Sequence, residues 1–537
     1  MSSTFFTSPS PSILQFTETT TTISGINQTH AHMLKTGLIH NPYNSSRLIS
    51  SITSLSPPLP HNLHYAHSIF THLHNPNSFS YNTLIRAYAN SHTPVTSISL
   101  FIDMLVDDHV VPDKFTYTFV LKGCSVARSV NVGKQVHGRV VKVGVDDDVY
   151  VCNTLIHMYA KGGCFDVARK LLDEMPERDV VSWNAILSAY VDAGMMGLAR
   201  EVFDEMPERN VESGNFMISG YVKDGLVVEA RRVFDEMSVK DVVSWNGIIT
   251  GYTRSGRFDE AFRLFEDMLK VGMVPDDYTL VNVLSSCASV SCLSQGEWIH
   301  AYIDRNKIDV SGFLATALVD MYSKCGCIEK AIDIFSKTSN KDISTWNSMI
   351  SGFGLHGYGE SALETFYELL VDGFKPNDVT FVSVLSACSR CGLLDEGYKI
   401  FDLMLHDYGI KPTIEHYGCM VDLLGRFGLL DEAEKLAKQV PVKESQVVWE
   451  SLLGACRNHN DVEMAERVSK RLLELDPRDS AGYVQLSNVH ASEGRFNDAG
   501  ELRRKMKAQG VSKDPGCSMI EVDGVVHEFL AGEGMIL

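Results

Sequence analysis

The chain repeats one short segment many times with small changes. The run VVSWNGIITGYTRSGRFDEAFRLFEDMLKVGMVPD, from Val242 to Asp276, returns as ISTWNSMISGFGLHGYGESALETFYELLVDGFKPN, from Ile343 to Asn377. A period of roughly 30 to 40 residues indicates a stacked array, in which each repeat buries its apolar face against its neighbours. The 537 residues are therefore expected to form one elongated array rather than several independent domains.

The repeats follow one another almost without interruption. Aligned on their apolar and Asn positions, they are 31 to 36 residues long. They start at Ser78, Lys114, Val149, Val180, Val211, Val242, Asp277, Gly312, Ile343, Asp378 and Ile414. A weaker repeat covers 42–77, and the tail of another precedes it. This arrangement leaves no room for a conventional catalytic domain before residue 445.

Each repeat is predicted to be two helices joined by a turn. In the Val242 copy, apolar residues recur at helical spacing from Val243 to Tyr252, residues 255–256 interrupt the pattern, and a second helix follows from Phe258 to Leu269. One face of the second helix is assigned to the core between hairpins: Ala261, Leu264 and Phe265. The pattern predicts an all-α, right-handed superhelical solenoid of helix-turn-helix hairpins.

Composition limits the partners of such an array. The chain has 48 Lys and Arg against 67 Asp and Glu, a formal charge of −19, which argues against nucleic-acid binding by bulk electrostatics. Any such function must rest on local placement of charge. The 12 cysteines follow no disulfide-framework spacing, and no apolar run reaches the roughly 18 residues of a membrane span.

The N-terminus resembles an organellar targeting sequence. Residues 1–20 are rich in Ser and Thr and lack Lys and Arg, which does not fit a secretory signal. We interpret residues 1–25 as a transit peptide. A mitochondrial presequence normally carries arginines, and the first Arg here is Arg47, so the composition favours the plastid over the mitochondrion. An unstructured N-terminus without a targeting role is the alternative.

Polar residues recur at two places of each repeat where a scaffold does not require them. The fifth places hold Asn82, Asn153, Asn184, Asn215, Asn246, Thr316 and Asn347. The last places hold Asp113, Asp179, Asn210, Asp241, Asp276, Asp342 and Asn377. Asn is a poor helix former, so its recurrence needs a reason. An Asn ladder between repeats would explain the fifth place, and helix capping would explain the last, but neither explains why the two are coupled.

Two further places complete a candidate surface. The thirteenth place carries a cation in Lys161, Lys223, Arg254, Lys324, Arg390 and Arg426. The second place carries an apolar or aromatic residue in Phe79, Tyr150, Val181, Val243 and Phe313. On a helix, places 2, 5 and 13 lie on the same side. This set suits a nucleic-acid strand, with apolar side chains between bases, amides against base edges and cations toward phosphates.

The repeat lengths and the motifs VVSWNxIIxGY, (D/E)EAxxxFxxM and xPD resemble the PLS class of pentatricopeptide repeat proteins of plant organelles. The resemblance gives degenerate repeats at 26–77, a repeat array at 78–445, paired E motifs at 446–514 and a short extension at 515–537. It implies that one repeat addresses one RNA base, chosen jointly by the fifth and last residues.

Transferred residue by residue, the resemblance implies a base order. It assigns uracil to Asn82 with Asp113, Asn153 with Asp179, Asn215 with Asp241, and Asn246 with Asp276. It assigns a pyrimidine to Asn184 with Asn210 and to Asn347 with Asn377, adenine to Ser46 with Asn77, and guanine to Thr316 with Asp342. The longer L-type repeats depart from this code, because Val281 and Val382 have no hydrogen bond to offer.

No catalytic centre is expected. Relatives with a deaminase domain carry His-x-Glu followed by Pro-Cys-x-x-Cys around zinc, and residues 515–537 contain neither element. Cys388 and Cys391 have metal-ligand spacing but no second pair nearby. The glycines of 352–357 fit G-x-G-x-x-G, but no strand precedes them, and they are interpreted as a hairpin turn.

The resemblance predicts a site-recognition factor for cytidine-to-uridine editing of an organellar transcript. The E motifs would recruit a deaminase in trans, itself a pentatricopeptide repeat protein of the DYW type, together with small accessory editing factors. No cofactor, metal or membrane is expected. Two alternatives remain open: a factor for RNA stability, splicing or translation without editing, and a protein-binding scaffold of the tetratricopeptide kind.

Overall fold

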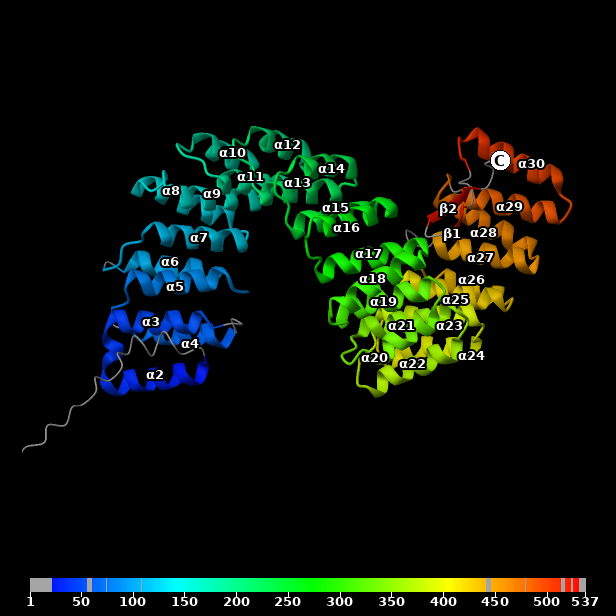
Figure 1. Cartoon of the computed structure of the whole chain (residues 1–537), viewed down its shortest axis with the longest axis horizontal. Coiled ribbons are helices and arrows are strands. Elements are labelled where there is room, and N and C mark those ends of the chain that lie inside the picture. Colours follow the sequence, from blue (N-terminus) through cyan, green and yellow to red (C-terminus); the bar gives the residue numbers. More distant parts are fainter. Residues whose placement is uncertain are drawn as a thin grey trace, which may run out of the picture. The chain divides into compact units, whose positions relative to one another are not determined.

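A computed structural model describes residues 22–55, 60–73, 75–107, 109–440, 446–478, 480–512, 517–522 and 525–530. The chain divides into two compact units, Met1–Gly251 and Tyr252–Leu537. Figure 1 labels the helices and strands of each unit. Most of the predicted transit peptide, residues 1–21, lies outside the described residues, as does much of the 515–537 extension.

The first unit is a series of helical hairpins. Its elements are α2 (Ile23–Thr36), η1 (Leu38–His40), α3 (Pro42–Thr53), α4 (Pro60–Thr71), α5 (Ser78–Ala89), α6 (Val95–Val106), α7 (Lys114–Val126), α8 (Val130–Val143), α9 (Val149–Lys161), α10 (Phe165–Glu174), α11 (Val180–Asp192), α12 (Met196–Glu205), α13 (Val211–Lys223) and α14 (Val227–Glu236). The next helix, α15 (Val242–Arg254), contains the boundary between the units.

The second unit continues the hairpins and ends in two strands. Its elements are α16 (Phe258–Lys270), α17 (Asp277–Val290), α18 (Leu293–Arg305), α19 (Gly312–Lys324), α20 (Ile328–Lys337), α21 (Ile343–Leu355), α22 (Gly359–Val371), α23 (Asp378–Cys391), α24 (Leu394–His406), α25 (Ile414–Arg426), α26 (Leu430–Ala437), α27 (Gln446–His459), α28 (Val462–Leu475), α29 (Ser480–Ser492), α30 (Phe496–Ala508), β1 (Cys517–Val522) and β2 (Val525–Leu530).

The helix boundaries follow from local sequence. Every first helix from α5 to α25 begins at the residue from which its repeat was aligned. In most hairpins the chain turns between the two helices through a glycine with positive φ, as at Gly225 (75°) and Gly357 (79°), whereas Arg128 and Ser291 take this place after α7 and α17. The conformation costs residues other than glycine energy. The predicted helix-turn-helix solenoid is confirmed within each unit.

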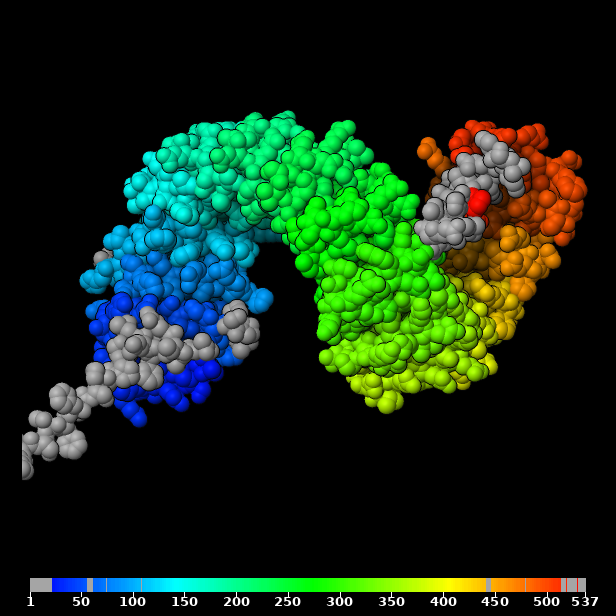
Figure 2. Space-filling model, in the orientation of Figure 1, coloured from blue at the N-terminus to red at the C-terminus, as the bar shows by residue number. Residues whose placement is uncertain are grey.

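The first helices make the continuous layer of each unit. In the first unit α5, α7, α9, α11 and α13 each pack on the next, while each second helix packs on its own first helix and on the following one. The second unit repeats this from α17 to α27. Successive hairpins therefore follow in sequence order through each body, as the colour gradient of Figure 2 shows.

The core lies between hairpins, as predicted. Ala261, Leu264 and Phe265 of α16 are at most 2% exposed. Aromatic pairs join neighbouring hairpins edge to face: the ring centroids of Phe234 and Trp245 are 4.8 Å apart in the first unit, and other such pairs occur in the second. Such pairs favour a fixed stacking geometry beyond the area that they bury.

The C-terminal strands were not predicted. β1 and β2 pair antiparallel, with Cys517 opposite Leu530 and Val522 opposite Val525. The pairing is a regular two-stranded ladder, and the other elements of the described residues are helices. Among the described residues, no helix is long and apolar enough to cross a membrane.

Candidate nucleic-acid interface

The last residue of each repeat caps the following first helix. The side-chain oxygens of Asp113, Asp179, Asn210, Asp241, Asp276, Asp342 and Asn377 accept the N–H three residues later at 2.8 to 2.9 Å. Asn77 does the same for α5. The capping explanation for this place is therefore confirmed. It is not the whole explanation, because the same oxygens have a second partner.

In the first unit the fifth residue donates to the capping residue. The amide nitrogen Nδ2 lies 3.0 Å from the capping oxygen Oδ1 in Asn82–Asp113 and Asn215–Asp241, and 3.3 Å in Asn153–Asp179 and Asn184–Asn210. These bonds connect different places of the repeat, so they do not form a ladder of fifth residues. They explain the coupling that the sequence displays, because one oxygen holds both a helix end and a side-chain amide.

Three of the other predicted pairs are arranged differently. Thr316 shares a hydrogen bond with the Thr345 hydroxyl, which in turn donates to Asp342 at 2.7 Å. Among the described residues no hydrogen bond joins Ser46 to Asn77, or Asn347 to Asn377; Ser46 donates instead to the backbone oxygen of its own helix at Tyr43. Asn246 and Asp276 fall in different units, where Asn246 is buried and Asp276 caps α17.

Two of the capping carboxyls have perturbed acidity. Burial alone would raise the pKa of Asp179, but hydrogen bonds from Ser182 and from the Asn153 amide outweigh it and hold that pKa below its ordinary value. The pKa of Asp241 is lowered in the same way, against its own burial, by the Asn215 amide and Ser244. Both carboxylates are therefore charged at neutral pH, and both are acceptors only.

The second-place side chains stand exposed beside these buried pairs. Phe79, Tyr150, Val181, Val243 and Phe313 are 49% to 74% exposed. Four more side chains at the second place were not predicted and are also more than half exposed: Tyr43, Phe115, Tyr278 and Val379. Three of these belong to L-type repeats, and their position in the alignment would have found them. These exposed apolar side chains therefore recur at one register of the array.

The thirteenth-place cations are all exposed: Lys161, Lys223, Arg254, Lys324, Arg390 and Arg426. Three of them form ion pairs that the sequence analysis did not foresee. Lys161 lies 2.6 Å from Asp192, Lys324 lies 2.8 Å from Asp320, and Arg426 lies 3.0 Å from Asp422. These cations must leave an acidic partner to meet a phosphate. Lys223 has no ion-pair partner among the described residues.

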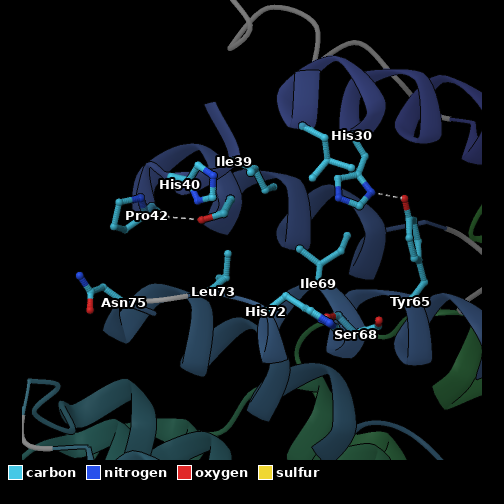
Figure 3. A pocket seen from close by; sticks show the side chains of 12 residues that line it. His30, Ile39, His40, Pro42, Tyr65, Ser68, Ile69, His72, Leu73 and Asn75 are labelled. Carbon is cyan, nitrogen blue, oxygen red and sulfur yellow. Dashed lines mark hydrogen bonds between the residues drawn. The ribbon is translucent and has the colours of Figure 1, made fainter. Parts of the chain in front are cut away.

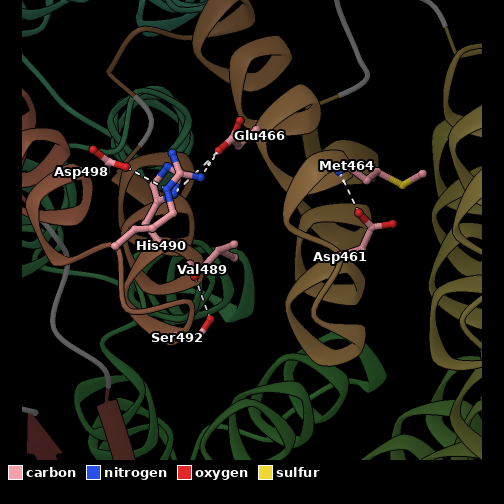
Figure 4. A network of polar contacts seen from close by, with 8 residues as sticks. Asp461, Met464, Glu466, Val489, His490, Ser492 and Asp498 are labelled. Atoms are coloured by element: carbon pink, nitrogen blue, oxygen red, sulfur yellow. Dashed lines mark hydrogen bonds and ion pairs between the residues drawn. The ribbon is translucent and has the colours of Figure 1, made fainter.

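The final two hairpins lack the paired polar residues. At the fifth place α27 has Glu450, which accepts from Gln446 at 3.0 Å, and α29 has Val484. An ionic network joins these hairpins instead: Arg495 donates to Glu466 at 2.6 Å and to Asp498 at 2.8 Å (Figure 4). This region is built to hold its own helices together, and it offers no amide at the place where the array offers one.

A pocket near the N-terminus lies among α2, α3 and α4. It has a volume of about 350 Å³, and His30 Nδ1 shares a 2.6 Å hydrogen bond with the Tyr65 hydroxyl at its edge (Figure 3). Burial lowers the pKa of His30. Similar His–Tyr pairs join a second helix to the next first helix at His67–Tyr88, His137–Tyr159 and His300–Tyr322. Their recurrence within the packing layer identifies them as scaffold.

The cysteine and glycine motifs lie in ordinary helical surroundings. Cys388 is buried in α23, and burial raises the pKa of its thiol to about 12, so the thiolate that a metal prefers is disfavoured. Among the described residues, no group of three or more His, Cys, Asp or Glu is placed to hold a metal ion. Gly352 and Gly354 lie within α21, and Gly357 lies in the turn that follows it.

Comparison with known families finds one kind of repeat along most of the chain. The PPR repeat family matches residues 76–126, 178–215, 240–289 and 341–390. The PPR repeat matches 150–180, 215–242, 313–343, 379–407 and 415–441. The E motif matches 459–521, a range that contains α28, α29, α30 and most of β1.

Curated relatives and solved structures agree with this. A pentatricopeptide repeat-containing protein of Arabidopsis thaliana is 59% identical, over 93% of this chain and 92% of its own length. A chloroplastic one from the same plant is 45% identical, over 96% and 86%. The crystal structure of the pentatricopeptide repeat protein PPR10 from maize superposes with a TM-score of 0.62 at 19% identity, over 91% of this chain and 77% of that one. A structure of PPR10 with an 18-nt psaJ RNA element gives a TM-score of 0.54 at 18% identity, over 88% and 80%.

Proposed function

Because the chain belongs to the pentatricopeptide repeat family, we propose that it binds one single-stranded organellar RNA by sequence and marks a cytidine in it for conversion to uridine. The observation that carries RNA binding is the register of three features. Asn amides bonded to capping oxygens recur in four hairpins of the first unit; three of these also carry an exposed apolar side chain at the second place, and the 149–179 hairpin adds the exposed cation Lys161.

Each feature has a chemical use toward a single strand. An exposed ring or branched side chain packs on a base, and a preoriented amide reads the base edge. An Asn side chain that a carboxylate already holds loses little further conformational entropy on binding. The −19 net charge is compatible with this, because recognition rests on placed groups rather than on bulk attraction. The RNA complex of maize PPR10 supports this choice of ligand.

The editing role rests on the E motif at 459–521. Its hairpins lack the paired amides of the array, which fits a region that contacts a protein rather than a base. A deaminase acting in trans and small accessory factors would be its partners, and this chain would supply specificity rather than catalysis. The chloroplastic relative and the Ser/Thr-rich residues 1–20 support a plastid or mitochondrial location.

The base order tests the RNA-binding half. In selection from a randomised single-stranded RNA pool, the wild-type chain should enrich uracil at the place read by Asn215 and Asp241. The Asn215→Thr variant should enrich guanine there and leave the other places unchanged. An identical enriched sequence for both proteins would contradict the reading assigned to this pair.

Organellar RNA sequencing tests the editing half. A null mutant should lose one or a few C-to-U events, and the full chain should restore them. Loss of a transcript or of a splicing event, with all editing intact, would instead support an RNA-stability or splicing factor. Crosslinking the protein in organelles and sequencing the bound RNA would identify the transcript in either case.

A further inference from the structure

One second-place residue in the first unit is an acid that reaches a base-reading amide. Glu212 stands exposed in the first turn of α13, where most repeats have an apolar side chain. Asn184 Nδ2, in the preceding hairpin, donates to Glu212 Oε2 at 3.0 Å. Glu415 is the other acid at this place among the described repeats, and its Oε2 accepts from the Thr413 hydroxyl at 2.5 Å instead.

The two hydrogen bonds of Asn184 determine which of its groups remain for a ligand. Its Nδ2 carries two hydrogens, and these are directed to Asn210 Oδ1 at 3.3 Å and Glu212 Oε2 at 3.0 Å. A carboxylate can only accept, so Glu212 fixes the orientation of the amide. The carbonyl oxygen Oδ1 of Asn184 is buried and has no hydrogen-bond partner among the described residues. The reading site of this hairpin is thus left with acceptors and no amide donor.

Two other paired sites of the first unit, those of Asn82 and Asn215, keep an amide donor. Asn215 Oδ1 accepts from the Ser244 hydroxyl at 2.6 Å, and its Nδ2 donates to Asp241. One N–H of Asn215 therefore remains without a partner among the described residues. Asn82 is held in the same way, with its oxygen accepting from Thr116 at 2.7 Å. Both sites offer a donor where Asn184 offers acceptors.

The two pyrimidines differ in what they present to such a site. Cytosine carries an exocyclic N4 amino group with two donors, and uracil carries the acceptor O4 at the same position. Carboxylates accept well from the cytosine amine. Uracil O4 would instead face the Glu212 carboxylate with no proton between them, and unpaired acceptors brought together out of water are costly.

We propose that Glu212 is a specificity-determining residue that makes the 180–210 hairpin select cytosine over uracil. This rests on the proposed RNA binding and narrows its pyrimidine assignment for Asn184 with Asn210. The carboxylate acts in two ways: it accepts from the cytosine amine, and it occupies the Asn184 N–H that could otherwise donate to uracil O4. Glu212 belongs to the following hairpin, so this base is read by three residues from two repeats.

Two synthetic single-stranded RNAs test the proposal. They follow the assigned base order and differ only in having cytosine or uracil opposite the 180–210 hairpin. The wild-type chain should bind the cytosine RNA about tenfold more tightly, the ratio that one good base contact gives. Glu212→Gln and Glu212→Val should bring the ratio close to one. Removing a negative charge should raise the affinity for both RNAs by the same factor. The test therefore compares the ratio of the two affinities rather than either affinity alone.

Glu415→Gln is the matched control, because it removes an acid from the same place of another repeat and should leave the cytosine-to-uracil ratio at its wild-type value. An unchanged ratio in both Glu212 variants, or a wild-type preference for uracil, would overturn the proposal. If the wild-type chain binds both RNAs no better than a scrambled RNA, the proposed RNA-binding function itself fails. Thermal unfolding of each variant separates loss of fold from loss of selectivity: a variant that melts early and still keeps the ratio also counts against Glu212.

Discussion

The adjacent hairpins 180–210 and 211–241 show how far two near-copies can differ. They have the same length, the same Asn at the fifth place and the same turn, and they lie in one compact unit. Asn184 nevertheless donates both N–H groups, to Asn210 and Glu212. Asn215 donates one N–H group to Asp241, and its oxygen accepts from Ser244. The residue at the fifth place therefore does not by itself define the face offered to a base; its neighbours do.

The last residues of the two hairpins show that capping and reading are separable. Asn210 accepts the Ser213 N–H at 2.9 Å, and Asp241 accepts the Ser244 N–H at 2.8 Å. An amide oxygen and a carboxylate oxygen thus serve equally as a helix cap. Only the carboxylate adds charge and acceptor-only chemistry at the reading site. Substitutions that keep one role and remove the other can divide the two.

Asp241→Ala should have the largest effect, because it removes both roles. Loss of the cap should destabilise α15 by about 1 kcal/mol. Loss of the acceptor that orients Asn215 should remove the uracil preference of this hairpin, worth about 1 to 3 kcal/mol. Hydrogen exchange of residues 242–254 measures the first effect, and competition between RNAs differing at one base measures the second.

Asp241→Asn is its control. It keeps the cap, so exchange in 242–254 should remain near the wild-type rate, while base preference should move from uracil toward a mixed pyrimidine preference. If both substitutions changed hydrogen exchange and base preference equally, Asp241 would act through its charge on folding. Its hydrogen bond to Asn215 would then have no separate role in base preference.

Asn215→Ala should come next. It leaves the Asp241 cap in place and removes the amide, so stability should change little and RNA binding should weaken about tenfold for a uracil-containing target. Asn184→Ala should weaken binding similarly for a cytosine at the preceding base. Isothermal titration with the two RNAs checks both. If each variant lost affinity for the other's base, the proposed register between hairpin and base would be wrong.

The two cations of this region should give a smaller effect. Lys223 has no ion-pair partner among the described residues, whereas Lys161 is paired with Asp192 at 2.6 Å. Lys223→Ala should reduce the slope of log affinity against log salt by about 0.7, the value for one phosphate contact on a single strand. Lys161→Ala should reduce it less, and Asp192→Ala should increase affinity. If both lysine variants gave equal slopes, breaking the Lys161–Asp192 ion pair would not reduce RNA affinity.

Acid sensitivity should be the smallest difference. Hydrogen bonds lower the pKa of Asp241 in the fold, against its burial, so its contribution to stability is present above the unfolded pKa and is lost as pH falls through the folded pKa. Between neutral pH and pH of about 3, the wild-type chain should lose more protection in 242–254 than the Asp241→Asn chain does. The 211–223 helix, capped by the non-titrating Asn210, serves as the internal reference in the same exchange experiment.

Much of the fold could be predicted from the sequence, because the repeat supplies the same evidence many times over. First helices begin where the aligned repeats begin, since an Asp or Asn cap precedes an apolar face in most of them; α19 and α25 instead follow Ser311 and Thr413. The C-terminal strands at 517–530 occur once, with no second copy to compare. The exposed Phe115 and Tyr278 were not predicted. They belong to L-type repeats, which depart from the base code, so the code gave no reason to single out their second places.

The candidate site could be located but not described at the level of atoms. The places of the fifth, last, second and thirteenth residues follow from helical phase alone. That Asp192 would neutralise Lys161, or that Glu212 would take an N–H of Asn184, depends on side chains from neighbouring helices. Residues 31 and 28 positions apart along the chain come within hydrogen-bond distance only when two hairpins stack.

The sequence by itself thus determined the period, the hairpin, the capped helix starts and the surface on which polar and apolar places recur, because these depend on local geometry that each repeat contains in full. Only the tertiary structure decided which donor or acceptor each reading residue has left for a ligand. That inventory is set across the junction between hairpins, where a cap, a hydroxyl or an acid from the next repeat takes up one hydrogen-bonding group and leaves another.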